Sequence, residues 1–61
     1  MYETFEKLKN ERGITTYKVA QDTGLTQTMF SDWKNGKSRP KADKLKILAE
    51  YFGVNIEVFI A

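Results

Sequence analysis

Compact hydrogen-bonding side chains are concentrated between residues 27 and 35, where an ordinary surface helix would carry long lysines and glutamates. On a helical wheel at about 100° per residue, one arc of roughly 140° contains Gln27, Thr28, Ser31, Asp32 and Asn35. Amides, hydroxyls and carboxylates of this size match the donor and acceptor patterns that nucleic-acid bases present in a groove. The pattern indicates a helix that reads bases, or else a surface helix whose polar side has no ligand.

The side of this segment opposite the polar arc must pack against a scaffold, because it carries Met29, Phe30 and Trp33. Thr26 is suited to cap a helix that runs to about Asn35. A second short helix, Thr16–Thr23, precedes it. Gly24 lies between the two, where a sharp turn between steeply packed helices often needs a positive φ. We therefore expect a helix-turn-helix over about residues 16–35.

Two longer helices are expected on either side of this pair, at Tyr2–Arg12 and from about Lys41 to Phe52. Each is followed by a glycine that can end it. The later helix has an inward apolar stripe at helical spacing, formed by Leu45, Leu48, Ala49 and Phe52.

The last segment, Val54–Ala61, can be read in two ways. Its β-branched residues nearly alternate with polar ones, as in a strand, whereas Asn55 is suited to cap a short helix. A strand would need a partner, and none is indicated elsewhere in the sequence, so we favour the helix. The expectation is an all-α fold, a bundle of five helices that forms a single domain over residues 1–61.

Composition excludes most catalytic and metal sites. The 61 residues contain neither cysteine nor histidine, which removes zinc fingers, cysteine–histidine catalysis and serine–histidine triads. We expect no metal, no cofactor and no enzymatic activity. The longest unbroken apolar run, Val58–Ala61, is far shorter than the ~18 residues that indicate a membrane span. The acidic N-terminus does not resemble a secretory signal, so we expect a cytoplasmic protein without membrane contact.

Positive charge is concentrated in the middle of the chain. The net charge is only +2, yet six basic residues and one acid lie between Lys34 and Lys46. Such a distribution suits a surface that meets a polyanion on one side. The alternative is a lysine-rich face that is simply solvated.

The order and spacing of several motifs make a family resemblance specific. The segment Gly13–Pro40 resembles the helix-turn-helix core of the Cro/C1-type (Xre-like) repressors, and the likeness continues through residues 45–54. The matching positions are Ala20, Gly24, Trp33, Asn35-Gly36-Lys37, Pro40 and Gly53-Val54. The resemblance implies a lambda repressor-like DNA-binding domain of five helices. It also implies a phage or bacterial regulator, acting as a repressor, that binds a palindromic operator in double-stranded DNA as a homodimer at the nucleoid.

Carried over by position, the resemblance assigns two groups of DNA contacts. The residues nearest the bases are Gln27, Thr28, Ser31 and Asp32. The residues at phosphates are Thr16, Thr26, Asn35 and Lys37, to which the basic loop adds Arg39 and Lys41. Helix N-termini favour phosphate because their free N–H groups and the helix dipole point toward it. Lys18 and Lys34 are weaker candidates, and Tyr2 carries no separate functional signal.

Four positions depart from the family's usual pattern. Thr16 stands where glutamine is frequent. Thr23 occupies a usually apolar core position, where its hydroxyl should bond back to the helix. Lys34 stands where the family often has an acid, which relatives often pair with a basic residue on the first helix. The counterpart of that basic residue here is Lys9. Two basic residues cannot form a salt bridge, so we expect none there and a higher local positive charge. Asp32 brings a negative charge toward a polyanion, which makes it a candidate specificity filter.

A partner surface is expected on the last two helices, where little interior is left to hide Ile47, Tyr51, Val58 and Ile60. We interpret these residues as a homodimer patch, and the alternative is contact with a downstream domain. The same patch motivates a second functional hypothesis, a protein-interaction module such as the antitoxin partner of a toxin. Such a module would bind random duplex weakly and without a steep salt dependence.

Overall fold

Threonine caps and one left-handed glycine set the ends of the two helices at the centre of the chain. Thr15 Oγ1 accepts a hydrogen bond from the Lys18 N–H at 3.1 Å, and α2 (Thr16–Thr23) begins immediately after it. Thr26 caps α3 (Gln27–Lys34) in the same way. Between them Gly24 has φ 78°, a conformation that glycine adopts without steric cost. The expected helix-turn-helix is therefore present.

The computed structural model describes residues 2–60, which form five helices and no strand. The remaining three helices are α1 (Tyr2–Glu11), α4 (Ala42–Phe52) and α5 (Glu57–Ile60). Asn55 Oδ1 accepts from the Glu57 N–H at 2.9 Å and so caps α5. The all-α, five-helix expectation is confirmed, including the helical reading of the last segment. Within residues 2–60, no helix is long and apolar enough to cross a membrane.

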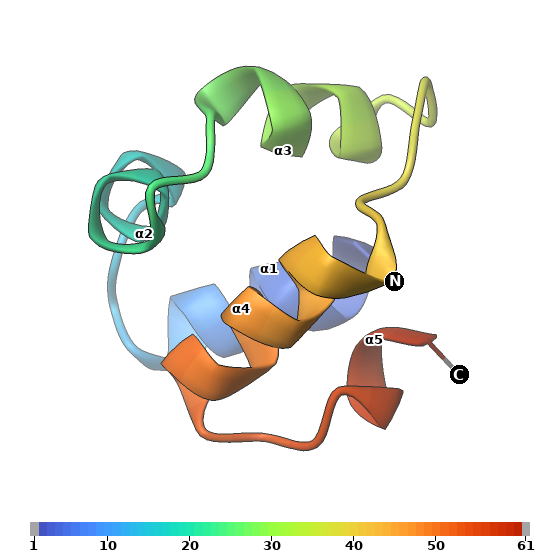
Figure 1. Ribbon diagram of the computed structural model, residues 1–61. Coiled ribbons are helices and arrows are strands. Elements are labelled where there is room, and N and C mark those ends of the chain that lie inside the picture. Colours follow the sequence, from blue (N-terminus) through green and yellow to red (C-terminus); the bar gives the residue numbers. More distant parts are fainter. Residues whose placement is uncertain (1, 61) are drawn as a thin grey trace.

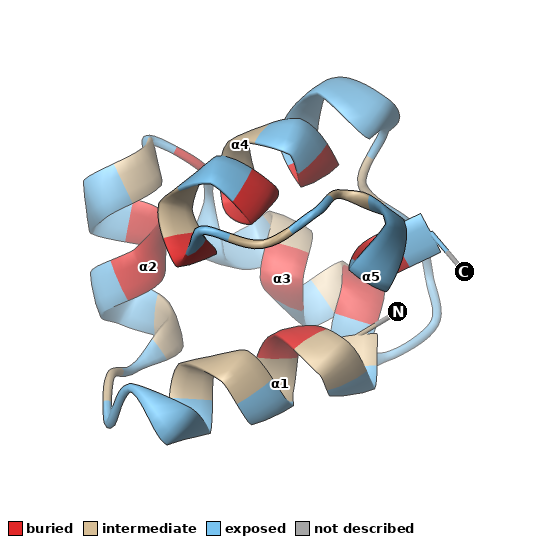
Figure 2. Ribbon diagram, turned by 90° about the horizontal axis from the view of Figure 1, so that it is seen from below, coloured by how far each residue is buried: buried red, intermediate tan, exposed pale blue. Residues whose placement is uncertain are grey.

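The five helices place α3 along one edge of the molecule (Figure 1). In that view α1 and α4 lie beneath α3. Seen from below, α2 and α5 stand at opposite ends, with α1 and α4 between them (Figure 2). The buried residues face the middle of this arrangement, so the outer side of α3 is left to solvent.

An aromatic cluster ties α3 to the helices beneath it. Phe5 of α1 is fully buried, and its ring stacks on Phe30 with centroids 4.7 Å apart. The Phe5 ring centroid also lies 5.8 Å from that of Trp33 and 6.0 Å from that of Phe52 on α4. The remaining buried apolar residues of this core are Val19, Ala20, Leu25, Leu45, Leu48, Ala49 and Phe59. Because a buried phenylalanine contributes about 1.5–3 kcal/mol, this cluster fixes the orientation of α3.

Three hydrogen bonds from two side chains, Thr23 and Arg12, fix the connections around α2 and α4. The Thr23 hydroxyl donates to the Val19 carbonyl oxygen at 2.7 Å, as expected for a polar residue at this core position, and accepts from the Leu25 N–H at 3.3 Å. Arg12 Nη2 donates to the Phe52 carbonyl oxygen at 2.6 Å. The guanidinium thereby satisfies a free carbonyl at the end of α4, where a cation also complements the helix dipole.

Candidate nucleic-acid interface

The polar side of α3 faces outward because its apolar side is anchored in the core. Phe30 and Trp33 are only 2% and 6% exposed. Of the residues expected to contact bases, the structure exposes Gln27, Thr28 and Ser31. Asp32 is half-buried. The helix thus presents short donors and acceptors to solvent from a backbone that the aromatic core holds in place.

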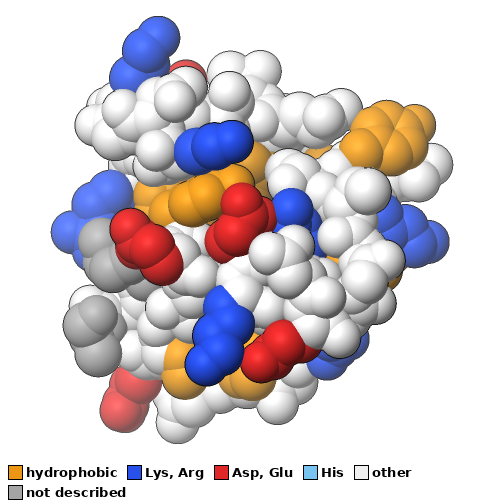
Figure 3. Space-filling model, turned by 180° about the vertical axis from the view of Figure 1, so that it is seen from behind, with side chains coloured by type: hydrophobic (Ala, Val, Ile, Leu, Met, Phe, Trp, Pro, Cys, Tyr) orange, Lys and Arg blue, Asp and Glu red, His pale blue; other side chains and the backbone are white. Residues whose placement is uncertain are grey.

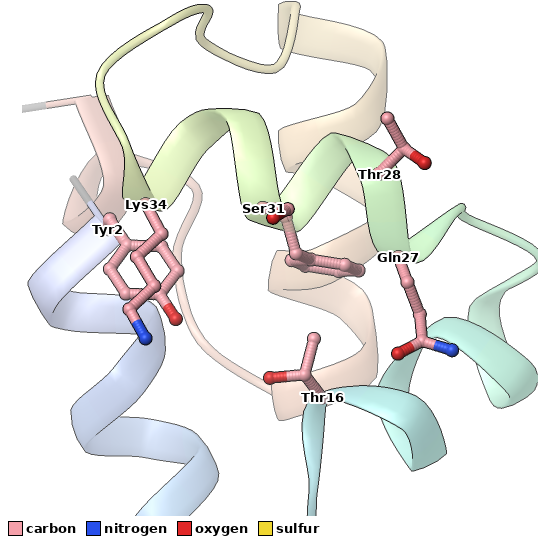
Figure 4. Close-up of a pocket in the computed structure, with 7 residues that line it drawn as sticks. Tyr2, Thr16, Gln27, Thr28, Ser31 and Lys34 are labelled. Atoms are coloured by element: carbon pink, nitrogen blue, oxygen red, sulfur yellow. The ribbon is translucent and has the colours of Figure 1, made fainter.

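A groove of about 360 Å³ runs beside this polar side and is walled by α1, α2 and α3. Its lining consists of Tyr2, Thr16, Gln27, Thr28, Phe30, Ser31 and Lys34. Figure 4 shows the Gln27 amide pointing toward α2, where Thr16 stands at the first turn, while Thr28 points away. The structure therefore brings three expected base-contacting residues, Gln27, Thr28 and Ser31, to the same groove as the expected phosphate-contacting residue Thr16.

The start of α3 offers a hydroxyl with a hydrogen still to donate. Thr26 is exposed, and its Oγ1 accepts from the Met29 N–H at 3.1 Å. A threonine hydroxyl that accepts one bond retains its own proton as a donor. Thr26 can therefore cap the helix and bind a phosphate oxygen at the same time.

The loop that follows α3 folds back onto the end of the helix. The carbonyl oxygen of Asp32 accepts from the N–H groups of Lys37 and Ser38 at 2.8 Å and 3.4 Å. These bonds fix the loop next to the polar arc. The expected phosphate-contacting residues beyond α3 are all exposed: Asn35, Lys37, Arg39 and Lys41. The loop after α3 leaves the helix at the end away from α2 (Figure 1).

Comparison with known proteins agrees with this geometry, since the model of the helix-turn-helix family matches residues 5–59. The chain belongs to this family. The resemblance to the Cro/C1 type is thereby confirmed. The chain is also similar to the HTH-type transcriptional activator BcrR of Enterococcus faecalis, at 25% identity over 59 residues. That match covers 97% of this chain and 29% of BcrR, so the chain spans less than a third of that relative. No solved structure matches the chain significantly.

In this helix-turn-helix domain, α1 carries an acid that faces both Lys9 and α3. Glu6 Oε1 lies 2.7 Å from Lys9 Nζ. The hydrogen bond from Lys9 is the main reason that the pKa of Glu6 is lowered, and the charge of Lys34 contributes. Glu6 therefore offsets part of the positive charge that Lys9 and Lys34 bring to this region.

The face that contains α1 shows how this charge is arranged (Figure 3). Acidic side chains lie across the middle of the face, and the rim over α3 consists mainly of uncharged side chains and backbone. A strip of apolar surface with lysine or arginine above it separates the two regions. Apart from Asp32 on α3 itself, most acidic side chains of this face are thus set back from the rim over α3.

Tyr2 is a groove residue that sequence reasoning missed. Its ring meets Trp33 edge-on, with centroids 5.5 Å apart, and lies 5.6 Å from Phe5. Burial, followed by the charge of Glu6, raises the pKa of the phenol. Tyr2 and Trp33 are distant in sequence, so no local spacing could have indicated that α1 lines the groove of the helix-turn-helix.

The structure separates the residues expected to form a homodimer patch. Val58 and Ile60 on α5 are 39% and 51% exposed. Ile47 and Tyr51 on α4 are half-buried and pack against the core. The Tyr51 hydroxyl donates to Asp22 on α2, and α2 and α5 stand at opposite ends of the domain (Figure 2). Tyr51 therefore has a partner within the chain, away from the exposed pair on α5.

Proposed function

We propose that this domain binds double-stranded DNA sequence-specifically, with α3 in the major groove, and represses transcription from the bound site. The observation that carries this proposal is the two-sided character of α3. Its aromatic side is buried, and its exposed side carries short donors and acceptors flanked by basic residues. An α-helix fits the major groove, where each base pair presents a distinct pattern of hydrogen-bonding groups.

Sequence choice is assigned to the exposed side of α3. Gln27 can form a bidentate pair with adenine N6 and N7, while Thr28 and Ser31 can reach neighbouring base edges. Asp32 can accept from cytosine N4. Elsewhere its negative charge near a polyanion opposes binding, so Asp32 rejects sequences that offer no donor at its position.

Affinity is assigned to residues on both sides of α3 that meet the phosphate backbone. Thr16 and Thr26 stand at the starts of α2 and α3, where free N–H groups and the helix dipole favour an anion. The exposed loop supplies Asn35, Lys37, Arg39 and Lys41. Phosphate contacts fix the register of the protein on the duplex but do not themselves read sequence.

We further propose that two copies pair through α5, because Val58 and Ile60 are its large exposed apolar residues. Ile47 would contribute at the margin, and Tyr51 would remain bonded to Asp22. A symmetric pair sets two recognition helices about one DNA turn apart, which matches a palindromic operator. Occupying an operator that overlaps a promoter would repress it, and a reporter with the operator so placed distinguishes repression from activation.

Selection of bound duplexes from a random pool tests the proposal directly. We expect enrichment of a palindromic sequence, and a dissociation constant that rises steeply with salt on every duplex. Failure to enrich any sequence, together with weak and salt-independent binding of random duplex, would contradict the proposal. That outcome would favour the protein-interaction module, such as an antitoxin, as the function of the domain.

A further inference from the structure

Two grooves beside α3 share one wall. The first, of about 360 Å³, lies between α3 and the first turns of α1 and α2. The second, of about 330 Å³, lies between α1, the end of α3 and the loop that carries Ser38 and Arg39. Tyr2 and Lys34 line both grooves. These two side chains therefore form a ridge that separates the grooves, which we call the Tyr2–Lys34 ridge.

The base of the Tyr2–Lys34 ridge is held by the aromatic core. The Tyr2 ring stands at 85° to the Trp33 ring, and it also contacts Phe5. Aromatic contacts of this kind restrict the ring more than apolar burial alone. Lys34 is exposed, and Figure 4 shows its side chain running along the Tyr2 ring toward the phenol end. A flexible lysine thus lines the same two grooves as a ring that the core holds in place.

The charge at the tip of the Tyr2–Lys34 ridge is available to a ligand. Glu6 is the nearby acid, and its Oε1 is paired with Lys9 at 2.7 Å. Burial, followed by the charge of Glu6, raises the pKa of the neighbouring Tyr2 phenol. Within residues 2–60, Lys34 itself forms no ion pair. Glu6 therefore attracts the Lys34 ammonium at longer range, while the ammonium remains exposed.

We propose that Lys34, supported by Tyr2 and Glu6 of α1, binds a backbone phosphate of the DNA at the Tyr2–Lys34 ridge. This inference rests on the proposed DNA binding and adds α1 to the surface that holds the duplex. Lys34 is on α3 and Glu6 is on α1. The positive charge of Lys34 therefore lies nearer the polar arc than the negative charge of Glu6. A lysine ammonium meets phosphate as a point charge, so this contact adds affinity without sequence choice.

Titration of the full chain with a fluorescent random-sequence duplex at several salt concentrations tests the ridge. We expect Lys34→Gln to weaken binding by about threefold to tenfold and to reduce the slope of log K against log salt by about 0.9. The matched control is Lys7→Gln, which removes the same charge from an exposed position on α1 that lines neither groove. The control should leave the slope unchanged.

Tyr2→Phe separates the supporting role from the charge. The ring and its packing are kept, so the salt slope should stay the same while affinity falls about two- to threefold through loss of the hydroxyl. Lys34→Arg keeps the charge and should restore most of the slope lost in Lys34→Gln.

The outcomes distinguish this inference from the proposed function. One outcome is that the wild-type protein binds in a salt-dependent way and that Lys34→Gln and Lys7→Gln have equal slopes. This would overturn the phosphate contact proposed for Lys34 and leave the proposed DNA binding intact. The ridge is also overturned if Lys34→Arg fails to restore the slope, because a loss of helical structure would then explain the effect of Lys34→Gln. Absence of salt-dependent binding by the wild-type protein would overturn the proposed function itself.

Discussion

The Tyr51 hydroxyl donates a hydrogen bond to Asp22 Oδ2 at 2.7 Å and joins the end of α4 to α2. The other oxygen of the same carboxylate, Oδ1, lies 3.3 Å from Lys18 Nζ. Thr16 is on α2 too, and α2 packs against α3. The link therefore fixes a helix that frames one wall of the groove beside α3.

We expect Tyr51→Phe to lower the Tm at pH 7. The hydrogen bond from Tyr51 is the main reason that the pKa of Asp22 lies below its usual value, and Lys18 adds to it. A carboxyl group with a lower pKa in the folded state stabilises the fold above its unfolded pKa, and this stabilisation is lost as pH falls through the folded value. The difference in Tm between wild type and variant should therefore narrow below about pH 3.8, the ordinary pKa of this group.

Thermal unfolding followed by circular dichroism at pH 7 and in acid measures this difference. Tyr17→Phe is the control, since Tyr17 is 60% exposed, and it should match the wild type at both pH values. A Tyr51→Phe variant as stable as the wild type at pH 7 would show that the link does not hold α2. A difference that persists unchanged in acid would mean that Asp22 is not its source.

The exposed pair on α5 gives a prediction about assembly. We expect Val58→Asp with Ile60→Asp to abolish pairing, because two buried carboxylates would repel each other across a symmetric apolar contact. Light scattering coupled to size exclusion should show a dimer for the wild type and a monomer for the double variant, with equal helix content. Tyr17→Asp, at an exposed position on α2, should leave the dimer intact. A monomeric wild type, alone and on a palindromic duplex, would contradict pairing through α5.

Local signals in the sequence account for most of the fold. Thr26 and Gly24 could be assigned from the sequence because a cap and a left-handed glycine act within a few residues. Asn55 indicated a helix rather than a strand in the last segment for the same reason, since its side chain accepts from a backbone N–H two residues away. Helix bounds and the inward stripe of α4 follow from such short-range patterns.

Contacts between distant residues were beyond the reach of these patterns. The packing of Tyr2 on Trp33 and the bond of Tyr51 to Asp22 both join residues from separate helices. Their existence depends on how the helices cross, which local spacing does not specify. Lys9 pairs with Glu6, three residues earlier on α1, and the charge of Lys34 acts on the same carboxylate from α3.

Lys37 tests the assignment of affinity to the phosphate backbone. We expect Lys37→Ala to weaken binding equally on the preferred and on random duplex, and to reduce the salt slope by about 1. Lys46→Ala, at an exposed position on α4, is the control and should change neither. The measurement is fluorescence anisotropy on both duplexes over a range of salt concentrations. A loss confined to the preferred duplex would mean that Lys37 reads bases instead.

The central claim is that the exposed side of α3 reads base pairs, and Gln27→Ala tests it most directly. Binding of wild type and variant should be compared on the selected duplex, on its single-base changes and on random duplex at one salt concentration. We expect a loss of about 1–3 kcal/mol on the selected duplex, relaxed preference at one base position per half-site, and unchanged binding of random duplex. Equal losses on the selected and random duplexes would contradict the claim.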